Sequence, residues 1–242
     1  MITSPELGLS DEEKTILRKI IDYTKNNINH RTSDIWGCFS KPQLKKIIKD
    51  NAENEHELTF STLEVKGLKS IKKKLIKLLS SNCYNRCSYC KRPMGNYGWS
   101  WHIEHIKCKE HFRDLTFSLN NLTMACVDCN YRKSSRIDAY NLSHKIINPN
   151  SKNYKYSNHL KMNIFGTESL IMLKFNKIDD IGTDTYEYLQ FKKIEYSTTL
   201  RSINNSIENL IMDIEKKIGS THDTDLESLL INLKDRILER GS

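Results

Sequence analysis

The chain has few residues that form turns and no long apolar segment. Its 242 residues include only nine Gly and four Pro, and 38% are apolar. No apolar run approaches the roughly 18 residues that a membrane-spanning helix needs. The first residues, Met1 to Glu6, lack the basic and then apolar segments of a secretory signal peptide. These absences exclude a membrane protein, and we expect a soluble, folded, cytoplasmic chain.

Acidic residues are missing from one long segment, between Val65 and Ile103. The formal net charge of the chain is +8, which indicates an acidic partner. Apolar residues recur at three- and four-residue intervals over 67–80, which predicts an amphipathic helix with a basic outer face. A solvated lysine face is the plain alternative, and a membrane-surface helix is weaker because its apolar face has no Trp or Phe. The basic residues of the segment are Lys66, Lys69, Lys72, Lys73, Lys74, Lys77, Arg86, Lys91 and Arg92.

Cysteine is present in an odd number, seven, in a chain too long for a typical disulfide scaffold. Four of the cysteines form two Cys-x-x-Cys pairs, which in a reducing compartment suit a closed four-thiolate Zn²⁺ site. Cys38, Cys83 and Cys108 remain, and we expect them to be small buried hydrophobic residues. Cys83 lies four residues before Cys87 and could substitute for a pair member. The paired residues are Cys87, Cys90, Cys126 and Cys129.

The N-terminal third has local signals for helices. Ser10 and Glu13 form a capping box that predicts a helix through about Lys25. We expect a loop over 26–34, a second short helix over 41–50 with Pro42 in its first turn, and a strand over 58–65.

The central segment combines two expected strands and a helix. Aromatic and β-branched residues predict strands over 99–106 and 121–126, and a helix is expected from Cys129. Glu104 and His105 are neighbours in the first strand and therefore face opposite sides. They can share a site only if the strand bends or ends there. Because so small a unit cannot bury enough apolar surface alone, we expect metal binding by the four cysteines to stabilise it.

The cysteine pairs and the polar residues between them resemble the motif of a known family. The pattern Cys87-x2-Cys90, Glu104-His105-Ile106, Asn121-Leu122 and Cys126-x2-Cys129-Asn130-x2-Lys133 resembles HNH endonucleases with the ββα-metal fold, over residues 83 to about 136. The resemblance implies that His105 is the general base, that Glu104 and Asn130 hold a divalent cation, and that Asn121 braces the hairpin loop. Glu stands where Asp is commoner in the family, and Asn130 stands where many members have His. A carboxylate with an amide favours Mg²⁺, with Mn²⁺ as the other candidate.

Elementary chemistry agrees with these roles. A histidine titrates near neutrality and can take a proton from water, although a single histidine in a strand is more often a core residue. His102 and His111 are weaker candidates for phosphate or metal contact. Six basic residues are expected either to position phosphates or to lie in solvent: Lys91, Arg92, Arg113, Arg132, Lys133 and Arg136.

The sequence of the C-terminal region predicts turns and strand-like pieces followed by helices. Apolar stripes predict helices over 198–218 and 225–240, and a strand-like piece covers 169–175. The stripes are expected to pack in a core rather than to face a partner. This region loosely resembles the HNH proteins of anti-phage systems such as Septu and related retron cassettes. That resemblance implies an antiviral effector that works beside an ATPase partner.

Together these patterns predict an α+β, mostly helical chain with a small HNH core. The expected domains are a helical region over 1–82, the core over 83–140 and a helical region over 141–242. The expected function is metal-dependent hydrolysis of nucleic acid, with DNA favoured by analogy with the family. Two alternatives stay open: a zinc-stabilised nucleic-acid-binding module without catalysis, and a structural subunit of an ATPase-containing complex.

Overall fold

The computed structural model describes residue 2 and residues 5–95, 101–133, 145–167, 171–203, 205–221 and 223–240. Over these ranges the chain is α+β and mostly helical, with small antiparallel strand pairs, as the sequence predicts. None of the helices in these ranges is long and apolar enough to cross a bilayer.

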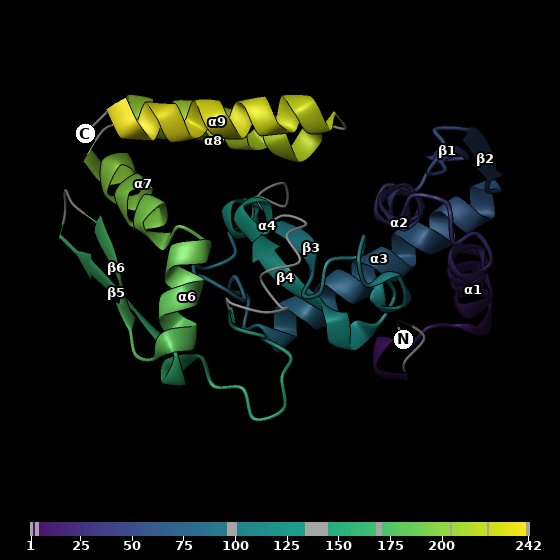
Figure 1. The fold of residues 1–242 in the computed structure, drawn as a ribbon, viewed down its shortest axis with the longest axis horizontal. Helices are drawn as coiled ribbons and strands as arrows, with labels where there is room; N and C mark the ends of the chain where they lie inside the picture. The colour runs from purple at the N-terminus through teal and green to yellow at the C-terminus, as the bar shows by residue number, and fades with distance from the viewer. Residues whose placement is uncertain are drawn as a thin grey trace. The chain divides into compact units, whose positions relative to one another are not determined.

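The chain folds into two compact units (Figure 1). Unit 1 consists of Met1–Asn85 and Ile103–Thr123, and unit 2 consists of Arg86–His102 and Met124–Ser242. The strands β3 (Trp101–His105) and β4 (Leu122–Cys126) pair with each other, and each crosses the boundary between the units. The central segment therefore contributes residues to both units.

Unit 1 begins with helices whose ends are set by local hydrogen bonds. Its elements are η1 (Pro5–Leu7), α1 (Asp11–Asn26), α2 (Thr32–Ser40), β1 (Lys45–Lys49), β2 (Glu55–Thr59), α3 (Thr62–Asn82), η3 (Arg113–Leu115) and η4 (Leu119–Asn121). The capping box predicted at Ser10 and Glu13 is confirmed. A second capping box, formed by Ser61 and Glu64, starts α3 five residues earlier than its apolar stripe indicates.

Three predictions for this part of the chain are wrong in kind or in their bounds. The helix expected over 41–50 is a strand, β1, and the helix α2 begins at Thr32, inside the loop expected over 26–34. The strand expected over 58–65 ends at Thr59. Pairing of β1 with β2 explains the error, because Asp50 Oδ1 accepts the backbone N–H groups of Ala52 and Asn54 and closes the turn between them.

The basic amphipathic helix is confirmed, and α3 packs its apolar face on α1 and α2. Leu68, Ile71 and Leu75 are fully buried. Two of its lysines bind within unit 1: Lys72 donates to the Ser40 carbonyl oxygen, and Lys74 pairs with Glu13. The others form a row of exposed side chains along one face, which we call the lysine row: Lys66, Lys69, Lys73 and Lys77.

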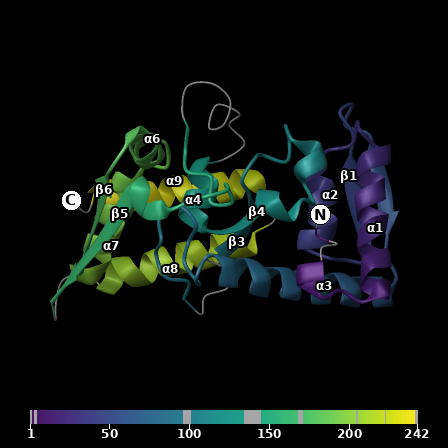
Figure 2. The ribbon, with the colours of Figure 1, turned by 90° about the horizontal axis from the view of Figure 1, so that it is seen from below.

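Unit 2 combines a hairpin with a set of helices (Figures 1 and 2). Its elements outside β3 and β4 are α4 (Val127–Lys133), η5 (Tyr156–Asn158), β5 (Leu160–Gly166), β6 (Ile171–Lys177), α6 (Asp180–Tyr188), α7 (Phe191–Ile203), α8 (Asn205–Ser220) and α9 (Thr224–Arg240). The expected helix over 225–240 is confirmed. The one expected over 198–218 falls in two helices, because α7 packs on β6 while α8 packs on α9. The strand-like piece expected from 169 begins partly outside the described residues, and β6 starts at Ile171.

The core of unit 2 surrounds the paired cysteines. One cluster joins the four thiols to Phe175, Phe191 and Ile194, and a second joins Val127 of α4 to α8 and α9. The apolar stripes of the C-terminal helices thus pack partly inside this unit, although Leu229 and Leu233 remain exposed.

Candidate functional site

The four paired cysteines converge in unit 2. Their sulfur atoms all lie within 4.8 Å of one another, all four residues are buried, and the Sγ atoms of Cys90 and Cys126 are 3.7 Å apart. Around a tetrahedral Zn²⁺ with Zn–S bonds of about 2.3 Å, neighbouring sulfurs lie roughly 3.8 Å apart. The donor set therefore fits a structural zinc. Cys83 belongs to unit 1, where its thiol contacts the Ser80 carbonyl oxygen.

Backbone hydrogen bonds shape the turn that carries the first pair. Lys91 adopts the left-handed conformation with φ of 59°, and its N–H donates to the Cys87 carbonyl oxygen. The N–H of Ser88 donates to the Met124 carbonyl oxygen of β4, and the N–H of Cys126 donates to Cys87 Sγ at 3.4 Å. These bonds tie the first pair to the strand that carries the second.

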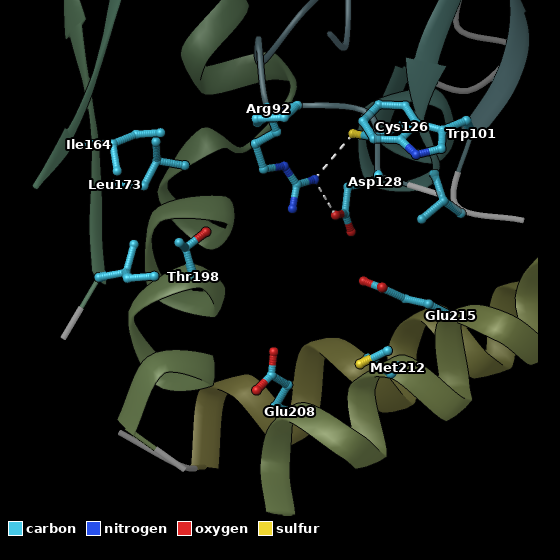
Figure 3. A pocket seen from close by; sticks show the side chains of 14 residues that line it. Arg92, Trp101, Cys126, Asp128, Ile164, Leu173, Thr198, Glu208, Met212 and Glu215 are labelled. Atoms are coloured by element: carbon cyan, nitrogen blue, oxygen red, sulfur yellow. Dashed lines mark hydrogen bonds and ion pairs between the residues drawn. The ribbon is translucent and has the colours of Figure 1, made fainter. Parts of the chain in front are cut away.

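Arg92 lies against the thiol cluster (Figure 3). Its Nε donates to Cys90 Sγ at 3.4 Å, and its Nη2 donates to Cys126 Sγ at 3.2 Å and to Asp128 Oδ2 at 2.5 Å. Burial disfavours the charged guanidinium, but the Cys126 and Cys90 thiolates and the Asp128 carboxylate hold the pKa of Arg92 well above its ordinary value. The guanidinium thus offsets part of the negative charge that four thiolates would bring to a zinc ion.

Asp128 extends this network to the C-terminal helix. Its carboxylate pairs with Lys234 of α9, whose Nζ also lies 3.6 Å from Glu215 Oε1 of α8. Burial opposes the charged form of Asp128, but Lys234 and Arg92 hold the pKa of the carboxyl below its usual range. A buried chain of alternating charges therefore joins the thiol cluster, α4, α8 and α9.

His105 is the last residue of β3, so the strand ends where the predicted site requires it to end. Its Nε2 lies 3.0 Å from the Thr116 carbonyl oxygen. A carbonyl oxygen can only accept, so Nε2 is the donor in this contact, and in a neutral ring the lone pair would be on Nδ1. The ring packs edge-on to Trp36 with centroids 4.4 Å apart. Both contacts fix the orientation of the imidazole within unit 1.

Asn121 closes the loop that follows β3. Its Oδ1 accepts the Lys107 N–H at 2.7 Å, and its Nδ2 donates to the carbonyl oxygens of Lys107 and Leu115 at 3.0 and 3.2 Å. Leu115 immediately precedes Thr116, whose carbonyl oxygen binds His105. The Asn121 amide is therefore connected to the histidine through the loop.

The remaining predicted residues divide between the units. Glu104 is buried in unit 1, next to His105 in the chain. Asn130 is half-buried on α4 in unit 2, where its Nδ2 lies 2.7 Å from His102 Nδ1. The contact between Asn130 and His102 is not predicted from the sequence. A weak signal for a role of His102 is its spacing from Glu104, because residues two apart in a strand lie on the same face.

The comparison with protein families supports the nuclease interpretation of this segment. Residues 87–136 match the HNH endonuclease family model. The match confirms the resemblance seen in the cysteine pairs, Glu104-His105 and Asn130, and covers 50 of the 242 residues. No curated protein and no solved structure is significantly similar to the chain. The HNH segment indicates nuclease function, nucleic-acid binding and use of a divalent metal, whereas the likeness to Septu and retron proteins and the ATPase partner receive no support.

Several basic residues of the HNH segment are engaged inside the protein. Arg113 donates to the carbonyl oxygens of Thr24, Asn27 and His30 in unit 1. Arg132 pairs with Asp235 of α9 at 2.9 Å. Arg92 bonds the thiol cluster, Lys133 is buried, Lys91 lies over the rings of Tyr154 and Tyr156, and Arg136 lies outside the described residues. That these six side chains contact phosphates stays a prediction.

A cavity of about 350 Å³ adjoins the HNH segment within unit 2 (Figure 3). Its lining includes three carboxylates, Asp128, Glu208 and Glu215, and one guanidinium, Arg92, with apolar side chains from β5, β6 and α8. An excess of negative charge repels phosphate. This cavity is therefore unsuited to the nucleic-acid backbone, and the substrate is expected at another surface.

Proposed function

We propose that the chain is a metal-dependent endonuclease whose HNH segment hydrolyses phosphodiester bonds, with DNA as the favoured substrate. The observation that carries the proposal is the position of His105: it ends β3 inside the matched segment, and its Nε2 donates to the Thr116 carbonyl oxygen. A neutral imidazole with an oriented lone pair is the form of histidine that can act as a general base.

In the proposed reaction, His105 Nδ1 accepts a proton from the attacking water. The Thr116 carbonyl oxygen then stabilises the imidazolium, because the Nε2–H bond to it strengthens as the ring becomes charged. Trp36 limits rotation of the ring, and Asn121 holds the loop that supplies the carbonyl. The water is thereby activated without a change in the position of the base.

Glu104 and Asn130 are proposed to hold the divalent cation, on the family pattern and on the suitability of carboxylate and amide oxygens for Mg²⁺ or Mn²⁺. Such a cation would supply positive charge that stabilises the negative charge developing on the phosphate and its leaving group. Zinc in the thiol cluster has a structural role, because four sulfur ligands leave no open coordination position.

The lysine row is proposed to bind the phosphates of the substrate. Lys66 and Lys77 are eleven positions apart on one helix, which separates them by about 17 Å along its axis. Lys66, Lys69, Lys73 and Lys77 are exposed, and they lie in the same unit as His105. The row thus offers a sequence-independent contact with the nucleic-acid backbone.

The anti-phage role is a further part of the proposal, and it rests only on the likeness of the region after residue 146 to Septu and retron proteins. It would make an ATPase the partner that licenses cleavage. Assaying the purified chain alone and with the protein encoded beside it tests this role, because the role predicts cleavage only, or much faster, in the mixture.

Replacing His105 with Ala should slow cleavage of supercoiled plasmid in Mg²⁺ or Mn²⁺ about 10²- to 10⁴-fold, the usual contribution of a general base. The measurement is the rate of conversion to nicked or linear plasmid by the wild type and the variant, with the partner present if it is required. His111→Ala, at an exposed histidine of unit 1, is the matched control and should cleave normally.

Equal rates for wild type and His105→Ala would refute the assigned mechanism. If neither protein cleaves but both bind DNA, the chain is the non-catalytic binding module. Zinc content and circular dichroism of each variant show whether a loss of rate reflects loss of fold.

Neutralising two members of the lysine row, with Lys69→Gln and Lys73→Gln together, should weaken DNA binding and reduce its dependence on salt. Each phosphate contact contributes about 0.9 to the slope of log K against log salt concentration, so the slope should fall by nearly two. Fluorescence anisotropy with labelled duplex over a salt series measures this. The pair Lys25→Gln and Lys155→Gln removes the same charge at exposed positions elsewhere and should leave the slope unchanged.

A further inference from the structure

The contact between His102 and Asn130 has the geometry of two ligands of one cation. His102 Nδ1 lies 2.7 Å from Asn130 Nδ2. The oxygen and nitrogen of a side-chain amide occupy nearly equivalent positions, and rotation of the amide by half a turn exchanges them. In the rotated state, Oδ1 of Asn130 and Nδ1 of His102 face the same point.

Both atoms are common metal ligands, and their separation suits adjacent coordination positions. In an octahedron with bonds of about 2.1 Å, neighbouring ligand atoms lie about 3.0 Å apart. The observed 2.7 Å is close to that value and needs only a small movement of either side chain. Both residues belong to unit 2 and both are half-buried, so the pair is defined within one unit and is accessible to an ion.

The position of His102 in β3 leads to the same conclusion. Side chains two residues apart in a strand point to the same face, so the positions of His102 and Glu104, the proposed carboxylate ligand, fall on one face of β3. The strand therefore presents a carboxylate and an imidazole side by side.

We propose that His102 is a direct ligand of the divalent cation, through Nδ1, beside Asn130. The inference deepens the proposed function, because it adds a residue to the cation site of the same HNH segment. An imidazole ligand suits Mn²⁺, Co²⁺ and Ni²⁺ better than Mg²⁺. The site should consequently prefer those ions to Mg²⁺, contrary to the preference that a carboxylate and an amide alone would give.

Binding of Mn²⁺ to the zinc-loaded full chain, without nucleic acid, tests the inference. Electron paramagnetic resonance of free Mn²⁺ gives the affinity, and zinc content verifies that the thiol cluster is intact. His102→Ala should lower Mn²⁺ affinity at least tenfold, while His111→Ala and His105→Ala should bind Mn²⁺ as the wild type does. His102→Ala should also bring the affinities for Mn²⁺ and Mg²⁺ closer together.

Equal Mn²⁺ affinity of wild type and His102→Ala, with one zinc per chain in each, would overturn the inference. The same holds if His102→Ala binds Mn²⁺ normally and only the cleavage rate at saturating Mn²⁺ falls, because His102 would then position Asn130 without binding the ion. Failure of the proposed function looks different: the wild type would bind Mn²⁺ in a His102-dependent way and cleave no substrate.

Discussion

Replacing Cys87 with Ser should release the zinc and unfold the part of unit 2 that surrounds it. The four thiols belong to a buried cluster with Phe175, Phe191 and Ile194, so a zinc ion bound by them would also support the apolar core. Structural zinc contributes about 10–16 kcal/mol of apparent binding free energy in small zinc domains, and that energy is folding energy. We expect the loss of one thiolate to remove enough of this energy to unfold the part of unit 2 around the thiol cluster.

Zinc per chain, measured by elemental mass spectrometry, should fall from about one to well below one in Cys87→Ser. Hydrogen exchange should accelerate over 86–95 and 124–133, while α1 and α3 of unit 1 stay protected. Cys38→Ser and Cys83→Ser replace buried cysteines of unit 1 and should retain the metal. Full zinc occupancy in Cys87→Ser, with loss in Cys83→Ser, would show that Cys83 is the ligand in place of Cys87.

The elements that were predicted correctly have local causes. The capping box at Ser10 and Glu13 and the apolar stripe of α3 are contained within a few helical turns, so the sequence alone carries their signal. The β1–β2 hairpin has no such signal. Lys45 to Lys49 form a strand only because β2 supplies partners for their backbone, and pairing across a turn outweighs the weak helical preference of a short segment.

The residues of the candidate site likewise include some that the sequence alone identifies and others that it does not. The spacing of the cysteines, Glu104, His105 and Asn130 identified the HNH segment, because the family pattern is compact in sequence. The groups that orient and support these residues are distant in sequence and have ordinary identities. Trp36 contacts His105 from another element, and Lys234 reaches Asp128 across 106 positions. No periodicity or motif marks either residue, so only the folded chain reveals them.

The buried charges around Asp128 give the last prediction. Asp128→Ala should lower the free energy of unfolding by about 3–5 kcal/mol, because it leaves a buried Lys234 without its nearest counter-charge. Glu215, at 3.6 Å, is a weak substitute. Urea unfolding of zinc-loaded protein at pH 7 measures the change. Glu187→Ala breaks the exposed pair with Lys177 in the same unit and should cost no more than about 1 kcal/mol.

The double variant Asp128→Ala/Lys234→Met tests whether the cost of Asp128→Ala comes from the unpaired ammonium of Lys234. Removing both charges leaves no unpaired Lys234 ammonium, so the double variant should be more stable than Asp128→Ala alone.

The pKa of Asp128 is lowered in the folded chain, so its contribution to the free energy of unfolding is present above the unfolded pKa of about 3.9 and is lost as the pH falls below that value. A cost below about 1 kcal/mol for Asp128→Ala at pH 7 would contradict this account, since Glu215 would then be a sufficient counter-charge for Lys234.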